Sequence, residues 1–206
     1  MVSDQPLFAG IDISTGRKPF TVAVLGDGLD VLAMQTGGID DVLTLLKEYE
    51  RVTLAIHVPT SRAGMDIHTD LRKKLDQAGF KPFAQGDGEL QWCETRTEDC
   101  FRAFQPKLLP RRTIDGRIQR ALILYEEGLQ LSDPMDYYEE ITRHKLLQGI
   151  LPAETIYSIR QLDALAAAYI AWMAENRPGQ VVIRGELILP KVMESDKENR
   201  EQLTYL

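Results

Sequence analysis

The amino-acid sequence predicts a single α/β domain built on a mixed β-sheet. Short apolar runs separated by turn residues fill the first quarter of the chain, which is typical of strands. A long alanine-rich segment near the other end has the spacing of a buried helix. The length of 206 residues suits one well-packed domain and is short for two. We expect this domain over residues 1–190, followed by a polar tail over 191–206.

Three short strands are expected first, over Leu7–Ile13, Thr21–Leu25 and Val31–Met34. The glycines and aspartate between them indicate tight turns, so the three strands predict an antiparallel meander. Helical spacing over Ile39–Leu46 then leads to a fourth apolar strand over Val52–Val58. A strand that is reached through a helix is usually parallel to its neighbour, and the sheet is therefore expected to be mixed.

The pattern is weaker over residues 60–119, where we expect an insertion of helices and loops. Ala121–Tyr125 is a short apolar run that predicts a fifth strand. Helical spacing returns over residues 141–148, and Gln161–Ala174 is the most helix-like segment of the chain. The expected architecture is thus a mixed five-stranded sheet, three antiparallel strands and then parallel ones, with flanking helices and a helical insertion.

Composition limits the classes of function. A net charge of −7 and a pI near 5.1 argue against binding to nucleic acid through bulk charge alone. The segment Arg96–Arg120 nevertheless holds seven basic and three acidic residues, so it could contact a phosphate backbone or form a solvated surface. No apolar run is long enough to cross a membrane, and the first residues lack the pattern of a secretory signal. We therefore expect a cytoplasmic protein with no membrane association.

Asp12 interrupts the first apolar strand immediately before a turn. An ionised carboxylate in such a place is costly unless something compensates its charge, and a metal ion is one such compensation. Short polar residues at strand ends also commonly cap a turn through the backbone. The residues alone leave both interpretations open.

Asp163 lies at the start of the predicted alanine-rich helix. The helix dipole favours an acidic residue there without any function. If the helix packs across the sheet near the first strand, however, Asp12 and Asp163 could hold one Mg²⁺ or Mn²⁺ ion through oxygen ligands. Clustered carboxylates of this kind are what metal-dependent hydrolysis of phosphodiesters requires.

Several segments carry a family resemblance, namely FAGIDIS, VTLAIHVP, ALILYEE, ITRHKLLQG and QLDALAAAYIAW, with a final strand in GELILP. They resemble a domain-of-unknown-function family of predicted nucleases with an RNase H-like fold. The resemblance implies that Asp12, Glu126 and Asp163 are catalytic acids on the first strand, the fifth strand and the C-terminal helix. The implied function is a divalent-metal-dependent nuclease or phosphodiesterase acting on nucleic acid.

One position departs from that family, because its fourth strand usually ends with an aspartate where this sequence has His57. His57 could be a metal ligand or a general base, with an ordinary pKa of about 6.5. Imidazole is a poor ligand for Mg²⁺, which favours a structural role at the strand end. The substitution also leaves an alternative function open, a non-catalytic RNase H-like module with a degenerate acidic site that binds a nucleic acid or protein partner.

Two further positions come from the resemblance. Glu126 has Glu127 beside it, and strand alternation does not choose between the two. Arg143 matches a basic position of the family and could bind phosphate, or could form an ion pair on a helix surface. The segment GIDIST also resembles the first phosphate loop of actin-like and sugar-kinase ATPases, but a second phosphate loop is missing.

Overall fold

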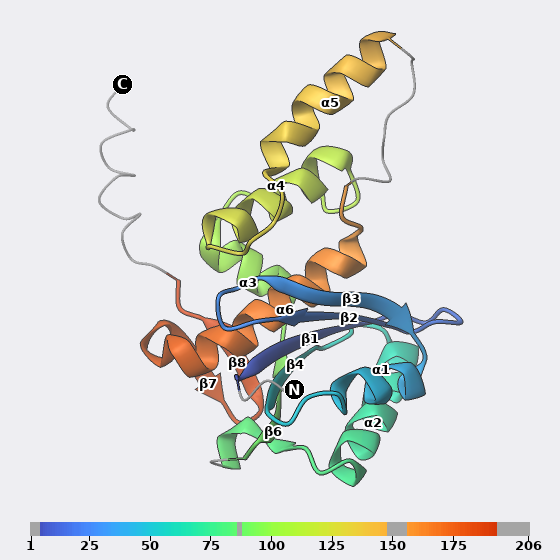
Figure 1. The fold of residues 1–206 in the computed structure, drawn as a ribbon, viewed down its shortest axis with the longest axis vertical. Coiled ribbons are helices and arrows are strands. Elements are labelled where there is room, and N and C mark those ends of the chain that lie inside the picture. The colour runs from blue at the N-terminus through green and yellow to red at the C-terminus, as the bar shows by residue number, and fades with distance from the viewer. Residues whose placement is uncertain (1–4, 86–87, 148–155, 193–206) are drawn as a thin grey trace.

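A computed structural model of the chain describes residues 5–85, 88–147 and 156–192. In these ranges the protein is a mixed α/β structure with an eight-stranded sheet and six α-helices (Figure 1). The polar tail expected over 191–206 lies almost entirely outside the described residues. None of the described helices combines the length and the apolar character that a bilayer crossing needs.

The first half of the sheet confirms the sequence prediction. Strands β1 (Leu7–Ile13), β2 (Phe20–Leu25) and β3 (Val31–Gly37) form an antiparallel meander. Helix α1 (Ile39–Leu46) follows and leads to β4 (Val52–His57), which pairs in parallel with β1. The sheet is therefore mixed, because its first connections are tight turns and its next one passes through a helix.

The expected insertion over residues 60–119 is wrong for its first part, because this segment contributes to the sheet. Helix α2 (Arg62–Gln77) is followed by the short strand β5 (Lys81–Pro82), the 3₁₀ turn η1 (Phe83–Gln85) and β6 (Leu90–Thr95). Strand β6 pairs in parallel with β4 and with β5. Its sequence LQWCET buries polar Gln and Thr side chains, so it lacks the apolar run by which strands are recognised.

The predicted fifth strand over Ala121–Tyr125 is also wrong, because these residues belong to helix α4 (Ile114–Glu126). The Thr113 side chain caps this helix by accepting a hydrogen bond from the backbone N–H of Gly116. The buried positions Ile118, Ala121 and Leu124 recur at helical spacing, so the apolar run is the last part of a longer amphipathic helix. Among the described residues the sheet has eight strands, whereas five were expected.

The remaining helices are α3 (Thr97–Phe104), α5 (Pro134–Leu147) and α6 (Ile159–Asn176). Helix α5 projects away from the sheet, beyond α4 (Figure 1). After the turn η2 (Pro178–Gln180), β7 (Val181–Arg184) and β8 (Leu187–Pro190) pair antiparallel, and β8 also pairs in parallel with β6. The strand order is β3-β2-β1-β4-β6-β8-β7, which places β1 and β4 in the middle of the sheet.

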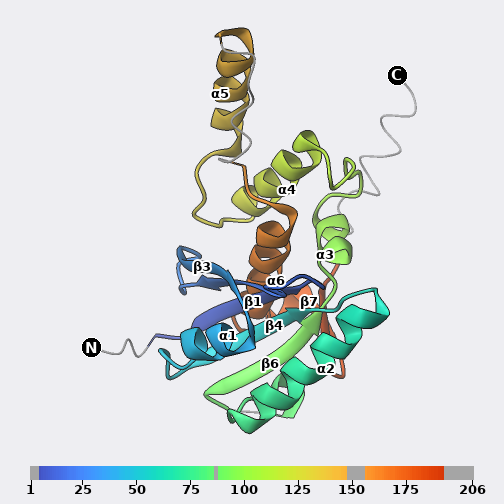
Figure 2. The same ribbon diagram turned by 90° about the vertical axis from the view of Figure 1, so that its right-hand side faces the viewer.

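The sheet separates two apolar layers. Helices α1 and α2 pack on one face, and α6 lies across the other (Figure 2). Helix α6 approaches β1 very closely at Gly10, where an added Cβ atom would lie 2.0 Å from the carbonyl oxygen of Ala164 and 2.2 Å from the backbone nitrogen of Ala168. This close approach carries the first turns of α6 to the carboxyl end of β1, where Asp12 is located.

Candidate metal centre

Three side chains from distant parts of the sequence meet where α6 crosses the carboxyl ends of β1 and β4. Asp12, His57 and Asp163 each offer one ligand atom, and these atoms all lie within 4.8 Å of one another. Asp12 is 5 % exposed and Asp163 is 3 % exposed, while His57 is half-buried. The structure therefore brings together the two carboxylates and the histidine that the sequence had singled out.

The pairing of the strands explains why Asp12 and His57 meet. Ile11 pairs with Ile56 in the parallel ladder, so the next residue on each strand is Asp12 and His57. Side chains alternate between the two faces of a strand, so Asp12 shares the face of Gly10, against which α6 packs. The same alternation places His57 on the face of Ala55, which belongs to the apolar layer under α6.

Asp163 does not serve as a helix cap. Helix α6 begins two residues earlier than expected, and Ser158 caps it, accepting from the backbone N–H of Gln161 at 3.3 Å. The side chain of Gln161 accepts in return from the N–H of Ser158 at 2.8 Å. Asp163 is thus in the second turn, already buried, and the need of the helix end for a cap does not account for it.

Arg160 compensates the charge of Asp12. Its Nε donates to Oδ2 of Asp12 at 3.0 Å, and its two other nitrogens donate to the carbonyl oxygens of Lys18 at 3.1 Å and Pro19 at 2.7 Å. Burial raises the pKa of Asp12, the charge of Asp163 raises it further, and the hydrogen bond from Arg160 opposes both. Asp12 therefore contacts an arginine of α6 and does not cap its own turn.

Two donors hold Asp163. The hydroxyl of Thr97 donates to Oδ1 at 2.7 Å, and Nη2 of Arg111 forms an ion pair with Oδ2. Burial raises the pKa of Asp163, while the charge of Arg111 and the hydrogen bond from Thr97 oppose the rise. Each of the two carboxylates is thus compensated by a separate arginine.

His57 lies beside Thr97, whose backbone nitrogen is 3.3 Å and whose hydroxyl oxygen is 3.2 Å from Nδ1. A backbone amide can only donate, so Nδ1 accepts and the proton of the neutral ring is on Nε2. Burial lowers the pKa of His57, while the charge of Asp12 opposes this effect. Imidazole binds metal ions through a nitrogen that carries no proton, so a cation would either replace the Thr97 amide at Nδ1 or bind Nε2 after the ring proton has left it.

The chemistry of this group follows from its donor atoms. Two carboxylates that face each other in a buried place need positive charge, and either arginines or a divalent cation can supply it. The buried Asp–His–Asp group could therefore hold a metal ion. Carboxylate oxygens suit Mg²⁺ and Mn²⁺, whereas an imidazole nitrogen suits transition metals, so the mixed set fits Mn²⁺ better than Mg²⁺.

Glu126 and Arg143 lie outside this three-residue group. Glu126 is exposed at the end of α4, and its neighbour Glu127 accepts a hydrogen bond from the hydroxyl of Tyr169 at 2.8 Å. Arg143 is exposed on the projecting helix α5 (Figure 2). The resemblance implied that Glu126 lies on the fifth strand of the sheet. Ala121–Tyr125 belongs to helix α4, so Glu126 lies at the end of a helix and not on the sheet.

Three residues of the site were missed by the sequence analysis in this role: Thr97, Arg111 and Arg160. A usable signal existed for Arg160, because residues three apart on a helix share a face and Arg160 precedes Asp163 by three. Thr97 follows β6, so it could be placed only once β6 was known to be the neighbour of β4. Arg111 was counted only as one charge of the basic segment.

Much of that basic segment has a structural role. Arg117 donates to the carbonyl oxygens of Ile156 and Tyr157, which fixes the chain just before α6. Arg120 is buried and donates to both carboxylate oxygens of Glu98, at 3.1 and 3.0 Å. The excess of positive charge in the sequence therefore overstates the charge that is available to a phosphate backbone.

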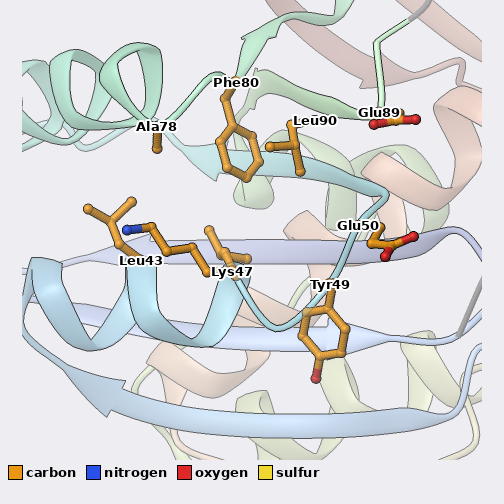
Figure 3. Close-up of a pocket in the computed structure, with 9 residues that line it drawn as sticks. Leu43, Lys47, Tyr49, Glu50, Ala78, Phe80, Glu89 and Leu90 are labelled. Carbon is orange, nitrogen blue, oxygen red and sulfur yellow. The ribbon is translucent and has the colours of Figure 1, made fainter. Parts of the chain in front are cut away.

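A pocket of about 250 Å³ lies at the other end of the parallel strands (Figure 3). It is lined by residues of α1, of the segment before β4, of the segment between α2 and β5, and of the start of β6, among them Leu43, Tyr49, Phe80 and Leu90. A strand rises about 3.3 Å per residue, so the six residues of β4 separate this pocket from His57 by roughly 20 Å. The pocket is not part of the candidate metal centre.

Comparison with known proteins adds no family: no protein-family model matches this chain, and no curated protein matches it.

Proposed function

We propose that this protein is a divalent-metal-dependent phosphodiesterase that acts on nucleic acid, with Asp12, His57 and Asp163 as the ligands of the cation. The observation that carries the proposal is the convergence of three ligand atoms within 4.8 Å from β1, β4 and α6. Side chains that are distant in sequence and buried together at the ends of central strands are typical of a functional site.

The arrangement of the sheet supports an RNase H-like fold as part of this proposal. Three antiparallel strands come first, and β4 and β6 then add in parallel beside β1. The neighbour of β4 in the sheet is β6, whereas Ala121–Tyr125 was expected to form the fifth strand. Asp12 lies on β1, Asp163 lies on α6, and His57 ends β4.

Each residue has a defined part in the proposed reaction. A bound divalent cation would lower the pKa of a water molecule and stabilise negative charge on the phosphate. Asp12 and Asp163 would hold it through one oxygen each and His57 through one ring nitrogen, and Thr97 would keep Asp163 oriented through its hydrogen bond. Arg160, which is fixed by two backbone carbonyls, would keep Asp12 in place. Attack of water on phosphorus would then break one ester bond, and the leaving oxygen would take up a proton.

Calorimetric titration with Mn²⁺ and Mg²⁺ tests the proposal, with the parent protein compared with Asp12→Asn. We expect the parent to bind Mn²⁺ more tightly than Mg²⁺, and we expect Asp12→Asn to weaken Mn²⁺ binding at least about tenfold, roughly 1.4 kcal/mol, because a neutral amide replaces an anionic ligand. Asp66→Asn is the matched control, because Asp66 is exposed on α2.

Cleavage of labelled single-stranded and double-stranded DNA and RNA in Mn²⁺ then tests the reaction itself. Chelation of the metal and the Asp12→Asn change should each abolish cleavage, whereas Asp66→Asn should leave it unchanged. Absence of Mn²⁺ binding by the parent protein contradicts the proposal.

The arginine pairs favour a second function, a metal-independent module that binds nucleic acid or a protein partner. Arg160 and Arg111 already compensate Asp12 and Asp163, so the group is electrically balanced without a cation. In this case nucleic-acid binding, measured by a gel shift, would be the same with Mn²⁺ and with a chelator.

A further inference from the structure

The two arginines of the metal centre differ in how firmly they are held. All three nitrogens of the Arg160 guanidinium have partners: Asp12, Lys18 and Pro19. In the described part of the chain Arg111 has a single partner, Oδ2 of Asp163, through Nη2. Its side chain is 39 % exposed, whereas that of Asp163 is 4 % exposed. Arg111 therefore extends from the surface to a buried carboxylate, and among the described residues its other guanidinium nitrogens have no hydrogen-bond acceptor.

Hydrogen bonds hold the backbone that carries Arg111, whereas its side chain is partly exposed and has one partner among the described residues. The loop over residues 105–113 is fastened to α4 by Gln119, which accepts from the N–H of Leu109 at 2.7 Å and donates to the carbonyl of Lys107 at 2.9 Å. Arg120 donates to the carbonyl of Leu109 at 3.1 Å, and Thr113 donates to that of Pro110 at 2.7 Å. Arg111 can thus change partners by rotating its side chain while the loop stays in place.

Arg111 occupies the carboxylate oxygen of Asp163 that Thr97 does not. Oδ1 already accepts from Thr97, so Oδ2 is the oxygen that we expect a metal to take. A guanidinium and a divalent cation at one carboxylate oxygen repel each other, so binding of one weakens binding of the other. Binding of the metal therefore releases the Arg111 head group, whose planar set of donors matches the oxygens of a phosphate.

We infer that Arg111 is an exchangeable counter-ion that neutralises Asp163 in the metal-free protein and binds a phosphate group of the substrate once a cation has taken its place. The inference rests on the proposed function, since it requires a metal at Asp163. It assigns substrate binding to a residue beside the metal centre, whereas Arg143 lies on the projecting helix α5.

Titration with Mn²⁺ alone tests the first half of the inference. We expect Arg111→Gln to bind Mn²⁺ about tenfold more tightly than the parent does, because the competing charge-assisted hydrogen bond is gone. Arg112→Gln is the matched control, since it removes the same charge from an exposed neighbour and should change Mn²⁺ affinity less than about twofold, which is within the usual size of surface charge effects. Weaker or unchanged Mn²⁺ binding by Arg111→Gln overturns the inference.

Titration with adenosine 5′-monophosphate at saturating Mn²⁺ tests the second half. This probe carries a phosphate but no diester bond that the proposed reaction could break. We expect Arg111→Gln to bind it about tenfold more weakly, which corresponds to the loss of a charged hydrogen bond, and Arg112→Gln to bind it like the parent. Equal binding by parent and Arg111→Gln contradicts the role in phosphate binding.

The outcomes separate this inference from the proposed function. A parent protein that binds no Mn²⁺ removes both, whereas a parent that binds Mn²⁺ with an affinity that Arg111→Gln does not raise removes the inference alone. Thermal unfolding of each variant checks folding. Should Arg111→Gln not fold, Arg111→Lys keeps the charge but loses the planar donor set, and it should weaken binding of the nucleotide while leaving Mn²⁺ affinity near that of the parent.

Discussion

At the scale of single residues, His57 determines what kind of ion the site prefers. It lies close to both carboxylates at the end of a central strand, and burial lowers the pKa of its ring while the charge of Asp12 opposes this effect. A neutral nitrogen ligand adds no negative charge, so the site carries less charge toward a cation than three carboxylates would. Selectivity between hard and borderline cations depends on this balance of oxygen and nitrogen ligands.

Replacing His57 by aspartate tests that conclusion. We expect His57→Asp to lower the ratio of Mn²⁺ to Mg²⁺ affinity about tenfold, roughly 1.4 kcal/mol of differential binding, because an oxygen ligand replaces the nitrogen that Mg²⁺ disfavours. Calorimetric titration with each ion gives the ratio. His57→Asn is the control, since it removes the ring without adding charge and should weaken both ions. An unchanged Mn²⁺ to Mg²⁺ ratio in His57→Asp would show that His57 is not a ligand.

The site residues that could be predicted are those whose burial needs compensation. Asp12 stood out because it interrupts an apolar strand, and Asp163 because a helix packed across the sheet could bring it to Asp12. Their arginine partners were not predicted, because a single sequence shows that a buried acid needs positive charge but not which cation supplies it. The pairing of Asp163 with Arg111 depends on how the loop over residues 105–113 folds back on α4, a contact between positions 52 residues apart.

At the scale of elements, the parts of the fold that were predicted are marked by the local sequence, and the parts that were missed depend on contacts between distant residues. The meander, the parallel β4 and helix α6 were predicted because turn residues and periodicity mark them locally. Strand β6 was missed because Gln91 and Thr95 are polar yet buried, and α4 was misread because its last apolar residues are consecutive. Long-range packing, which a local pattern does not contain, decides both cases.

Helix α2 is fastened to the sheet by a group of charged residues on the face opposite the metal centre. Arg72 donates to Glu94 of β6 at 3.1 Å and to Glu186, just before β8, at 2.9 Å, and its guanidinium lies 4.4 Å from the ring centre of Trp92. Nε2 of the buried His68 lies 3.3 Å from Glu94, close enough for an ion pair although its geometry falls short of a hydrogen bond. His68, and then Arg72, lower the pKa of Glu94, against the effect of burial.

We predict that Glu94→Gln destabilises the protein by about 1–2 kcal/mol at neutral pH, the scale of a hydrogen bond to a charged group. A carboxyl whose pKa is lowered in the folded state contributes stability above its unfolded value of 4.5, and that contribution is lost as the pH falls through the lower, folded value. The difference in free energy of unfolding between parent and variant should therefore be largest at neutral pH and should shrink below pH 4.5. Urea unfolding at several pH values measures it.

Glu89→Gln is the control for this prediction, because Glu89 is exposed just before β6 and its replacement should leave the free energy of unfolding within about 0.5 kcal/mol of the parent value. A difference between the parent and Glu94→Gln that persists unchanged in acid would mean that the ionised form of Glu94 is not what stabilises the attachment of α2.

At the scale of the whole molecule, the metal centre depends on how closely α6 lies on the sheet. Alanines line much of the buried surface of α6, and Gly10 lets the helix backbone contact β1 directly. Because Gly10 and Asp12 lie on the same face of β1, this contact also fixes how far Asp163 stands from Asp12. The separation of helix and sheet, and not the identity of the acids alone, makes them one site.

Gly10→Ala should therefore damage stability and metal binding together. An added methyl group would meet backbone atoms of α6 at 2.0 and 2.2 Å, and backbone cannot rotate away as a flexible side chain can. We expect a loss of about 3 kcal/mol in the free energy of unfolding, at the upper end of what overpacking costs, and weaker Mn²⁺ binding by the folded protein. Gly16→Ala is the matched control, because its methyl group would meet only Ser14 Oγ, at 3.9 Å. Urea unfolding and Mn²⁺ titration of both variants measure the two effects, and a Gly10→Ala protein as stable as Gly16→Ala would mean that α6 does not rest on β1 as described.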